Sequence, residues 1–112
     1  MRKILIAGTM SGSGKTTVSS ILMSAFENTA PFKVGPDYID PSYHAIFTGN
    51  KSYNLDAFMY NEETLKFIFS SNSSGKNISI IEGVMGLYDG LGHSKENFST
   101  AHVSKMLNVP VI

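Results

Sequence analysis

The sequence predicts an α/β fold in which helices flank a parallel β-sheet. Two short apolar runs are typical of strands buried on both faces of such a sheet: Ile4-Leu5-Ile6-Ala7, and the segment that carries Ile78, Ile80 and Ile81. Helical periodicity lies between the two runs, and a glycine-rich loop follows each of them. This alternation of strands and helices predicts a parallel rather than an antiparallel sheet.

The chain opens with a predicted strand at residues 4–7 and a loop at residues 8–14 that contains three glycines and two serines. From Lys15 onward the apolar residues recur at i, i+3, i+4, i+7 and i+8, a spacing that places them on one face of a helix. These residues are Val18, Ile21, Leu22, Ala25 and Phe26. We therefore expect a strand, a glycine loop and a helix that buries this face.

The middle of the chain gives a weaker pattern. Residues 32–34 form a second short strand that ends at Gly35-Pro36. Residues 37–61 show no sustained period, so we predict a long functional loop there. Asn61 is a predicted helix N-cap, because Glu62 and Glu63 follow it in the first turn. The apolar stripe of that helix is Leu65, Ile68 and Phe69.

The last third repeats the strand–loop–helix order. A buried strand at residues 78–81 ends at Glu82-Gly83, and after a glycine-rich loop Ser99 is the predicted cap of another helix. That helix carries Val103, Met106 and Leu107 and stops near residues 108–110. Val111-Ile112 begins a further strand, so the sheet is apparently truncated and residues 1–112 are interpreted as the first part of a longer domain.

Composition excludes several classes of protein. The length of 112 residues allows one domain, and 42% hydrophobic residues are too many for a disordered chain. The net charge of zero argues against a broad electrostatic contact with nucleic acid or anionic lipid. The absence of cysteine excludes disulfides, thiolate-bound metals and cysteine nucleophiles. No apolar run approaches the ~20 residues of a membrane span, and we expect a cytoplasmic protein.

The first glycine loop predicts a phosphate-binding site. Gly14-Lys15-Thr16 supplies the second half of the pattern G-x-x-x-x-G-K-[ST], between a strand and a helix as that pattern requires. The first glycine of the pattern is displaced by one residue, because Thr9 occupies its place and the glycine is Gly8. The backbone amides of such a loop form an anion-binding nest at the helix N-terminus. The alternative is a glycine-rich turn that contains a lysine by chance.

We predict that this loop binds the phosphates of a nucleoside triphosphate. Lys15 reaches the β- and γ-phosphates, and the Thr16 hydroxyl binds magnesium. The fold class is therefore a P-loop NTPase-type sheet. The expected nucleotide-binding residues are Gly12, Ser13, Gly14, Lys15, Thr16 and Thr17.

Acidic residues at strand ends are the candidate metal ligands. Glu82 ends a buried strand, where the ligand crevice of an open parallel sheet lies. A carboxylate there binds magnesium directly or through water; the alternative is an acid that caps loop amides. Asp37 and Asp40 follow the second strand, near Lys33, and bind metal or position a nucleophile in one interpretation. In the other they are ordinary turn formers beside prolines.

Two further side chains are assigned to the substrate side with less support. Asp89 belongs to an Asp-Gly turn signal, yet its loop leaves the same strand end as Glu82. The three histidines have no metal-ligand spacing, and His44 alone is a candidate for the substrate site.

Four motifs together resemble cobyrinic acid a,c-diamide synthase. They are the loop at residues 7–17, Lys33-Val-Gly-Pro-Asp-Tyr-Ile-Asp-Pro41, Asn54-Leu-Asp-Ala57 and Glu82-Gly-Val-Met-Gly-Leu-Tyr-Asp-Gly90. The resemblance covers nearly all of this chain but only the opening part of that family's proteins. It implies a synthetase domain similar to dethiobiotin synthetase, which shares the displaced glycine.

The resemblance also implies a reaction. ATP and an acetate side chain of a corrin ring give an acyl phosphate, and ammonia from glutamine then displaces the phosphate. Lys15, Lys33, Asp37, Asp40, Glu82 and Asp89 are the expected catalytic residues. Thr16, Asp37, Asp40 and Glu82 are the expected magnesium ligands, and Tyr38, Asp40, His44 and Asp89 the expected substrate contacts.

The chain departs from the family because it ends at residue 112 and has no cysteine for the C-terminal amidotransferase domain. We therefore expect an inactive fragment whose cut sheet edge favours self-association. Two alternatives stay open. One is amidation of a nickel tetrapyrrole, and the other is an ATPase switch of the partitioning or assembly type. Such switches usually carry an extra lysine where this chain has Met10.

Overall fold

The computed structural model describes residues 2–8, 15–36, 39–86 and 100–112. Its elements alternate between strand and helix, as the sequence predicts. In chain order they are β1 (Arg2–Gly8), α1 (Lys15–Ala25), β2 (Thr29–Val34), α2 (Ile39–Thr48), β3 (Tyr53–Leu55), α3 (Glu62–Ser73), β4 (Ile78–Gly86) and α5 (Thr100–Leu107).

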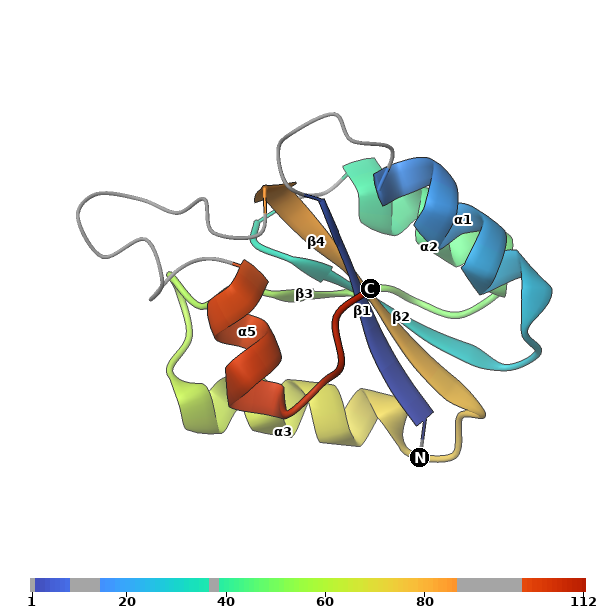
Figure 1. Cartoon of the computed structure of the whole chain (residues 1–112). Coiled ribbons are helices and arrows are strands. Elements are labelled where there is room, and N and C mark those ends of the chain that lie inside the picture. Colours follow the sequence, from blue (N-terminus) through green and yellow to red (C-terminus); the bar gives the residue numbers. More distant parts are fainter. Residues whose placement is uncertain (1, 9–14, 37–38, 87–99) are drawn as a thin grey trace.

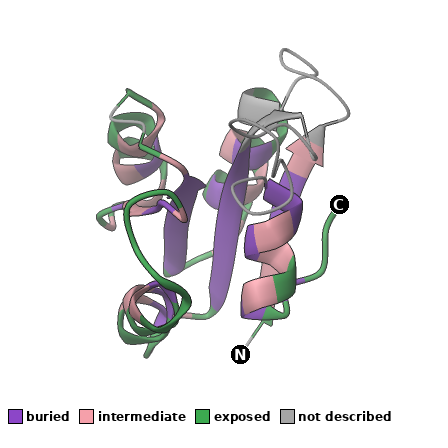
Figure 2. Cartoon of the chain, turned by 90° about the vertical axis from the view of Figure 1, so that its left-hand side faces the viewer, coloured by how far each residue is buried: buried purple, intermediate pink, exposed green. Residues whose placement is uncertain are grey.

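The four strands form one parallel sheet in the order β1-β4-β2-β3. Helices α1 and α2 lie together on one side of the sheet, and α3 and α5 lie on the other (Figure 1). The strands are buried at the centre, whereas the outer sides of the helices are exposed (Figure 2). The α/β class and the parallel sheet are therefore confirmed.

The two faces of the sheet have separate cores. On the α3–α5 face, side chains from the strands pack against Leu65, Phe69, Val103 and Leu107. On the α1–α2 face a smaller cluster joins Ile6, Met23, Ile78 and Ile80. Successive strand residues point to opposite faces, so both clusters draw on the same strands.

Three helix predictions are confirmed. Asn61 caps α3, because its side-chain oxygen accepts a hydrogen bond from the Thr64 amide at 2.8 Å. Leu65 and Phe69 are buried, and Ile68 packs against them. In α5, Val103 and Leu107 are buried and Met106 is partly buried. Ser99, the predicted cap of α5, lies outside the described residues.

The predicted face of α1 was only partly right. Val18 is 45% exposed and Ile21 is 63% exposed, whereas Ser19 and Met23 are fully buried. The buried face is rotated by about one residue from the predicted one, since Leu22 and Phe26 still pack against the core. The polar side chain of Ser19 is therefore buried on the sheet-facing side of α1, where the periodicity predicted the apolar Val18.

The predicted long loop at residues 37–61 was wrong. It contains α2 and the short strand β3. Pro41 falls in the first turn of α2, where no intrahelical N–H is required of it. Strand β2 is longer than predicted, because it begins at Thr29 rather than at residue 32.

The chain adds backbone pairing to β1 at its outer side. Leu5 donates to the Pro110 carbonyl at 2.9 Å, and Ile112 donates to the Leu5 carbonyl at 2.8 Å. A parallel bridge joins Leu5 to Val111. This pairing agrees with the prediction that Val111-Ile112 begins a further strand. Among the described residues, no helix has the length and apolar character needed to cross a membrane.

Candidate functional site

Glu82 is the centre of a buried polar cluster on the α1–α2 face. It lies on β4 and has no exposed surface. Its Oε1 accepts a hydrogen bond from Ser19 Oγ on α1 at 2.6 Å, and its Oε2 accepts one from Lys33 Nζ on β2 at 2.9 Å. The same carboxylate therefore contacts two different elements, one of which follows the predicted phosphate loop.

Lys33 joins Glu82 to the start of α2. Its ammonium donates to Asp40 Oδ2 at 2.7 Å and to the Gly83 carbonyl at 3.2 Å. The side chain of Lys33 is 5% exposed, and that of Asp40 is 19% exposed. The sequence predicted Lys33 and Asp40 near the end of the second strand and Glu82 at the end of another, and the structure brings the three side chains together. The predicted strand end was wrong, because β4 continues to Gly86 and Glu82 lies in its middle.

His44 completes the cluster from the second turn of α2. Its Nε2 lies 3.0 Å from Glu82 Oε1, and its Nδ1 lies 2.9 Å from Ser52 Oγ. The residue is 1% exposed. We predicted that His44 contacts the substrate, but both of its ring nitrogens are engaged inside the protein and the ring has almost no exposed surface.

The hydrogen bonds set the charges of the cluster. Burial alone would raise the pKa of Glu82, but hydrogen bonds from His44, Ser19 and Lys33 outweigh burial and hold that pKa well below the usual 4.5. Burial alone would lower the pKa of Lys33, but its hydrogen bonds to Asp40 and Glu82 raise it above 10.5. Glu82 is therefore a carboxylate and Lys33 an ammonium over the whole neutral range.

Asp40 behaves differently. Burial and the neighbouring Glu82 carboxylate raise its pKa above the usual 3.8, despite the hydrogen bond from Lys33. One ammonium is thus shared between two carboxyl groups, of which Glu82 holds its charge more strongly. Of the two, Asp40 is the one with exposed surface.

The described residues do not by themselves form a magnesium site. Carboxylate oxygens are suitable ligands for magnesium, but Glu82 is fully enclosed and accepts hydrogen bonds at both oxygens. In the described part of the chain, no group of three or more His, Asp or Glu side chains could hold a metal ion. Asp40 keeps exposed surface, whereas the predicted ligand Asp37 lies outside the described residues.

The sheet register extends the polar cluster to a third strand. Lys33 pairs with Glu82 of β4 on one side and with Asn54 of β3 on the other. Residues paired in this way share a face, so the three form a polar row across the sheet. The Asn54 Oδ1 atom is buried and has no hydrogen-bond partner.

The phosphate-loop residues are only partly described. Gly12, Ser13 and Gly14 lie outside the described residues, as do Tyr38 and Asp89. For Lys15 and Thr16 the structure gives the backbone alone, which forms the start of α1. Thr17 is exposed in the first turn of α1. The described backbone therefore contains the strand before the loop and the helix after it.

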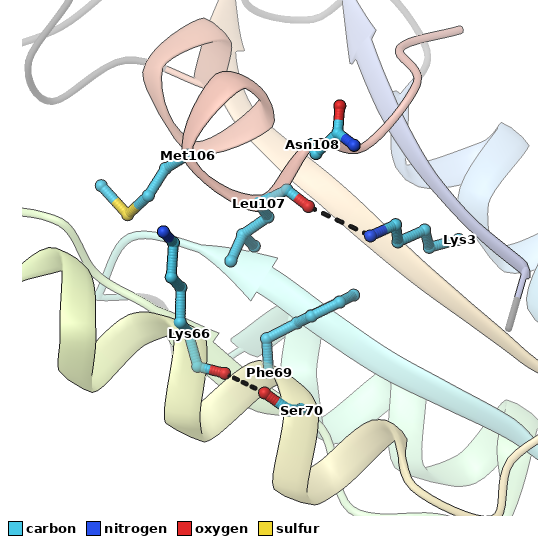
Figure 3. A pocket seen from close by; sticks show the side chains of 7 residues that line it. All are labelled: Lys3, Lys66, Phe69, Ser70, Met106, Leu107 and Asn108. Carbon is cyan, nitrogen blue, oxygen red and sulfur yellow. Dashed lines mark hydrogen bonds between the residues drawn. The ribbon is translucent and has the colours of Figure 1, made fainter.

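A surface hollow lies away from this cluster. It has a volume of about 380 Å³ and lies between α3 and α5 (Figure 3). The side chain of Lys3 borders it and donates to the Leu107 carbonyl at 3.2 Å. No residue that the sequence predicted for catalysis or binding lines it, and Lys3 lies near the amino end of β1 rather than the carboxyl end. We assign the site to the buried cluster for this reason.

Sequence analysis missed Ser19 and Ser52. Ser19 had no usable signal, because it shares a helix face with Met23, whose burial the apolar periodicity did not predict. Ser52 had none, because a serine before a short strand is indistinguishable from an ordinary loop serine. Both matter because each donates or accepts inside the cluster.

Comparison with known families decides the relationship. Residues 4–108 match the family described as CobQ/CobB/MinD/ParA nucleotide binding domain. The chain belongs to this family. The matched region begins in β1 and ends just after α5, so it includes the phosphate loop and the whole buried cluster.

Within the CobQ/CobB/MinD/ParA family, the chain is similar to several curated cobyrinate a,c-diamide synthases. It is 58% identical to that of Fusobacterium nucleatum over 112 residues, which are all of this chain and 25% of the relative. It is 50% identical to that of Methanocaldococcus jannaschii, with all of this chain and 26% of the relative covered. It is 54% identical to that of Caldanaerobacter subterraneus, with 99% and 25% covered. The chain spans about a quarter of the length of these relatives.

Proposed function

We propose that this chain is the nucleotide-binding part of an ATP- and magnesium-dependent amidoligase that acts on cobyrinic acid. The observation that supports this proposal most directly is the 58% identity to a cobyrinate a,c-diamide synthase across all 112 residues. The cluster of Lys33, Asp40 and Glu82 supports it independently, because Lys33 is next to the last residue of β2 and Asp40 lies at the start of α2, which follows the carboxyl end of that strand. Ligands of open parallel sheets bind at that edge.

The proposed reaction has two steps. An acetate carboxylate of cobyrinic acid attacks the γ-phosphorus of ATP, the bond to the β–γ bridging oxygen breaks, and ADP leaves. Ammonia derived from glutamine then attacks the acyl carbon, the C–O bond to phosphate breaks, and the nitrogen loses a proton. Phosphoryl transfer of this kind depends mainly on alignment and charge neutralisation.

The residues have separate proposed tasks. The loop amides at residues 12–14 and the Lys15 side chain hold the phosphates, together with Thr16 and Thr17. Lys33 was expected to orient the substrate carboxylate or the acyl phosphate, but its ammonium already donates to Asp40, Glu82 and the Gly83 carbonyl. Its proposed task is therefore to hold Asp40, the partner with exposed surface, beside the substrate. Tyr38 and Asp89 line the corrinoid side. Asp37 remains a proposed catalytic residue and metal ligand.

Magnesium, when bound, would neutralise phosphate charge. Thr16, Asp37 and Asp40 are its proposed ligands. The enclosed position of Glu82 suits an anchoring role better than the direct metal contact that the sequence suggested. We assign no step of the reaction to the metal.

Calorimetric titration of the chain with magnesium-ATP tests the nucleotide part of the proposal. We expect saturable binding that Lys15→Ala abolishes. Lys66→Ala is the matched control, because Lys66 lies on α3 with its side chain 53% exposed. Equal loss of binding in the two variants, or no binding by a folded chain, would contradict this part.

A trapping experiment tests the reaction and its substrate in a protein of the relatives' full length, made by joining this chain to the remaining part of the Fusobacterium nucleatum relative. Hydroxylamine replaces ammonia and converts an acyl phosphate into a stable hydroxamate. We expect hydroxamate and ADP to form together when cobyrinic acid is present. A nickel tetrapyrrole acid in its place tests the alternative substrate. ATP hydrolysis that neither acid stimulates would instead favour a switch of the partitioning type, a class that the family also includes.

A further inference from the structure

The buried cluster contains a chain of hydrogen bonds that joins three elements and the residue just before β3. It runs from Ser52, just before β3, to His44 on α2, then to Glu82 on β4 and Ser19 on α1. The three distances are 2.9, 3.0 and 2.6 Å. All four residues are buried, so water does not compete strongly for these hydrogen bonds.

The chemistry of the groups fixes the direction of the hydrogen bond between His44 and Glu82. A carboxylate only accepts hydrogen bonds, so His44 Nε2 must carry a proton and donate to Glu82. In the neutral ring Nδ1 is then an acceptor, and the Ser52 hydroxyl donates to it. Ser19 donates to the same Glu82 oxygen that His44 contacts.

This series of hydrogen bonds ends at Ser19, close in sequence to the predicted phosphate loop. Ser19 lies one helical turn after Lys15, the first residue of α1. The other Glu82 oxygen accepts a hydrogen bond from Lys33. Holding Glu82 in one orientation therefore fixes both the first turns of α1 and the ammonium of Lys33.

We propose that His44 and Ser52 are positioning residues, which orient Glu82 so that it anchors α1, and with it the phosphate loop, against β4. This inference rests on the proposed function only in taking that loop to bind a nucleotide. In this proposal His44 holds Glu82 in place, whereas the sequence had suggested that it contacts the substrate. Ser52 orients His44, and Ser19 links Glu82 to α1.

Two isosteric substitutions separate positioning from simple packing. The amide nitrogen of Gln reaches the place of Nε2, so His44→Gln keeps a donor to Glu82 and loses the Ser52 contact. The shorter Asn reaches the place of Nδ1, so His44→Asn keeps the Ser52 contact and loses the donor to Glu82. Ser52→Ala removes the outermost hydroxyl alone and is the mildest variant. Melting temperatures show which variants fold.

We expect His44→Asn to weaken magnesium-ATP binding about tenfold, the size of one lost charge-assisted hydrogen bond. His44→Gln restores most of that affinity, and Ser52→Ala costs about threefold. Should His44→Asn fail to fold, the affinities of His44→Gln and Ser52→Ala decide. Both variants lose the hydrogen bond between Ser52 and residue 44 but keep a donor to Glu82, so both should lose about threefold in affinity. Equal affinity losses in His44→Gln and His44→Asn, or unchanged affinity in Ser52→Ala, would overturn the proposal.

Two measurements without nucleotide keep the inference separate from the proposed function. Nitrogen NMR of His44 in the free chain should show a proton on Nε2 and none on Nδ1. Hydrogen exchange of the α1 amides should be faster in His44→Asn than in His44→Gln. If the wild-type chain binds no magnesium-ATP, the proposed function fails while these two results still decide the positioning. A ring protonated at Nδ1 alone, or α1 exchange that is the same in both variants, would refute it.

Discussion

The two faces of the sheet are built from the same strands but differ in composition and in proposed role. On the α3–α5 face the larger apolar cluster forms the main core, and Phe32 packs against Phe69 with ring centroids 5.0 Å apart. The polar side chains buried there, such as Ser73 and Ser79, carry no charge. On the α1–α2 face the apolar cluster of Ile6, Met23, Ile78 and Ile80 gives way to the row of Glu82, Lys33 and Asn54. One face carries the main core, and the other carries the candidate site.

The alternation of β4 shows how this division arises. Ile80 and Glu82 point to the α1–α2 face, whereas Ile81 between them packs on the other core. A change at one position therefore affects one face and leaves the other largely intact. Substitutions on the two faces should differ in kind: loss of packing on the α3–α5 face, and unpaired charge on the α1–α2 face.

Phe32→Ala should have the largest effect among changes on the α3–α5 face. Phe32 is fully buried, so its truncation leaves a cavity and should lower the free energy of unfolding by about 3–5 kcal/mol. Urea unfolding measures the change. Phe67→Ala is the control, since Phe67 is 70% exposed on α3 and its loss should stay within about 0.5 kcal/mol. Similar losses in the two variants would mean that this face is not the packed core.

Lys33→Met should be nearly as costly on the α1–α2 face, but for an electrostatic reason. It leaves the Glu82 carboxylate buried without its ammonium, a change that typically costs about 3–5 kcal/mol. Adding Glu82→Gln removes the unpaired charge and should recover most of the loss, as unfolding of the double variant would show. A double variant no more stable than Lys33→Met would mean that packing, rather than charge, dominates on this face as well.

The pH dependence of unfolding should also come mainly from the α1–α2 face. The pKa of Glu82 is lowered in the folded chain, so its stabilisation is present above pH 4.5 and is lost as pH falls below that value. The raised pKa of Asp40 acts with the opposite sign, because its contribution is present at low pH and lost as pH rises above 3.8. We expect the free energy of unfolding to fall between pH 5 and pH 3, and Glu82→Gln to flatten or reverse that fall. An unchanged slope in Glu82→Gln would show that Glu82 is not the responsible group.

The contrast between the faces explains what the sequence could reveal. Apolar runs marked β1, β4 and part of β2, but not the three-residue strand β3. The rule that ligands bind at the carboxyl ends of parallel strands singled out Glu82 as a candidate site residue, and the Lys33–Asp40 segment after the second strand supplied the other two. Helix α2 was overlooked although Ile39, Tyr43 and Ile46 recur at i, i+4 and i+7, a helical spacing. This short stripe lies in a segment that contains Pro41, and its side chains are exposed instead of packing on the sheet. The face of α1 was misassigned because Ser19 is buried by a hydrogen bond to Glu82, a contact 63 residues away in sequence. Buried polar residues escape a method that searches for buried apolar ones.

Gly83→Ala should give the smallest of these effects, and it tests how closely α5 approaches the sheet. Gly83 follows Glu82 and so points to the α3–α5 face, where a Cβ would lie 2.7 Å from Thr100 Cγ2 and 2.9 Å from the Ile6 carbonyl oxygen. Such overpacking typically costs about 1–3 kcal/mol. Adding Thr100→Ala removes the contacts with Cγ2 and with Oγ1, at 3.0 Å, but leaves the backbone contact, so thermal unfolding should show partial recovery relative to Thr100→Ala alone. Full recovery would mean that α5 alone limits the space, and no recovery would mean that the backbone of β1 does. Partial recovery would show that the side chain of α5 and the backbone of β1 both lie too close to Gly83 to leave room for a Cβ. A glycine next to Glu82 would then be required by the packing of the α3–α5 face.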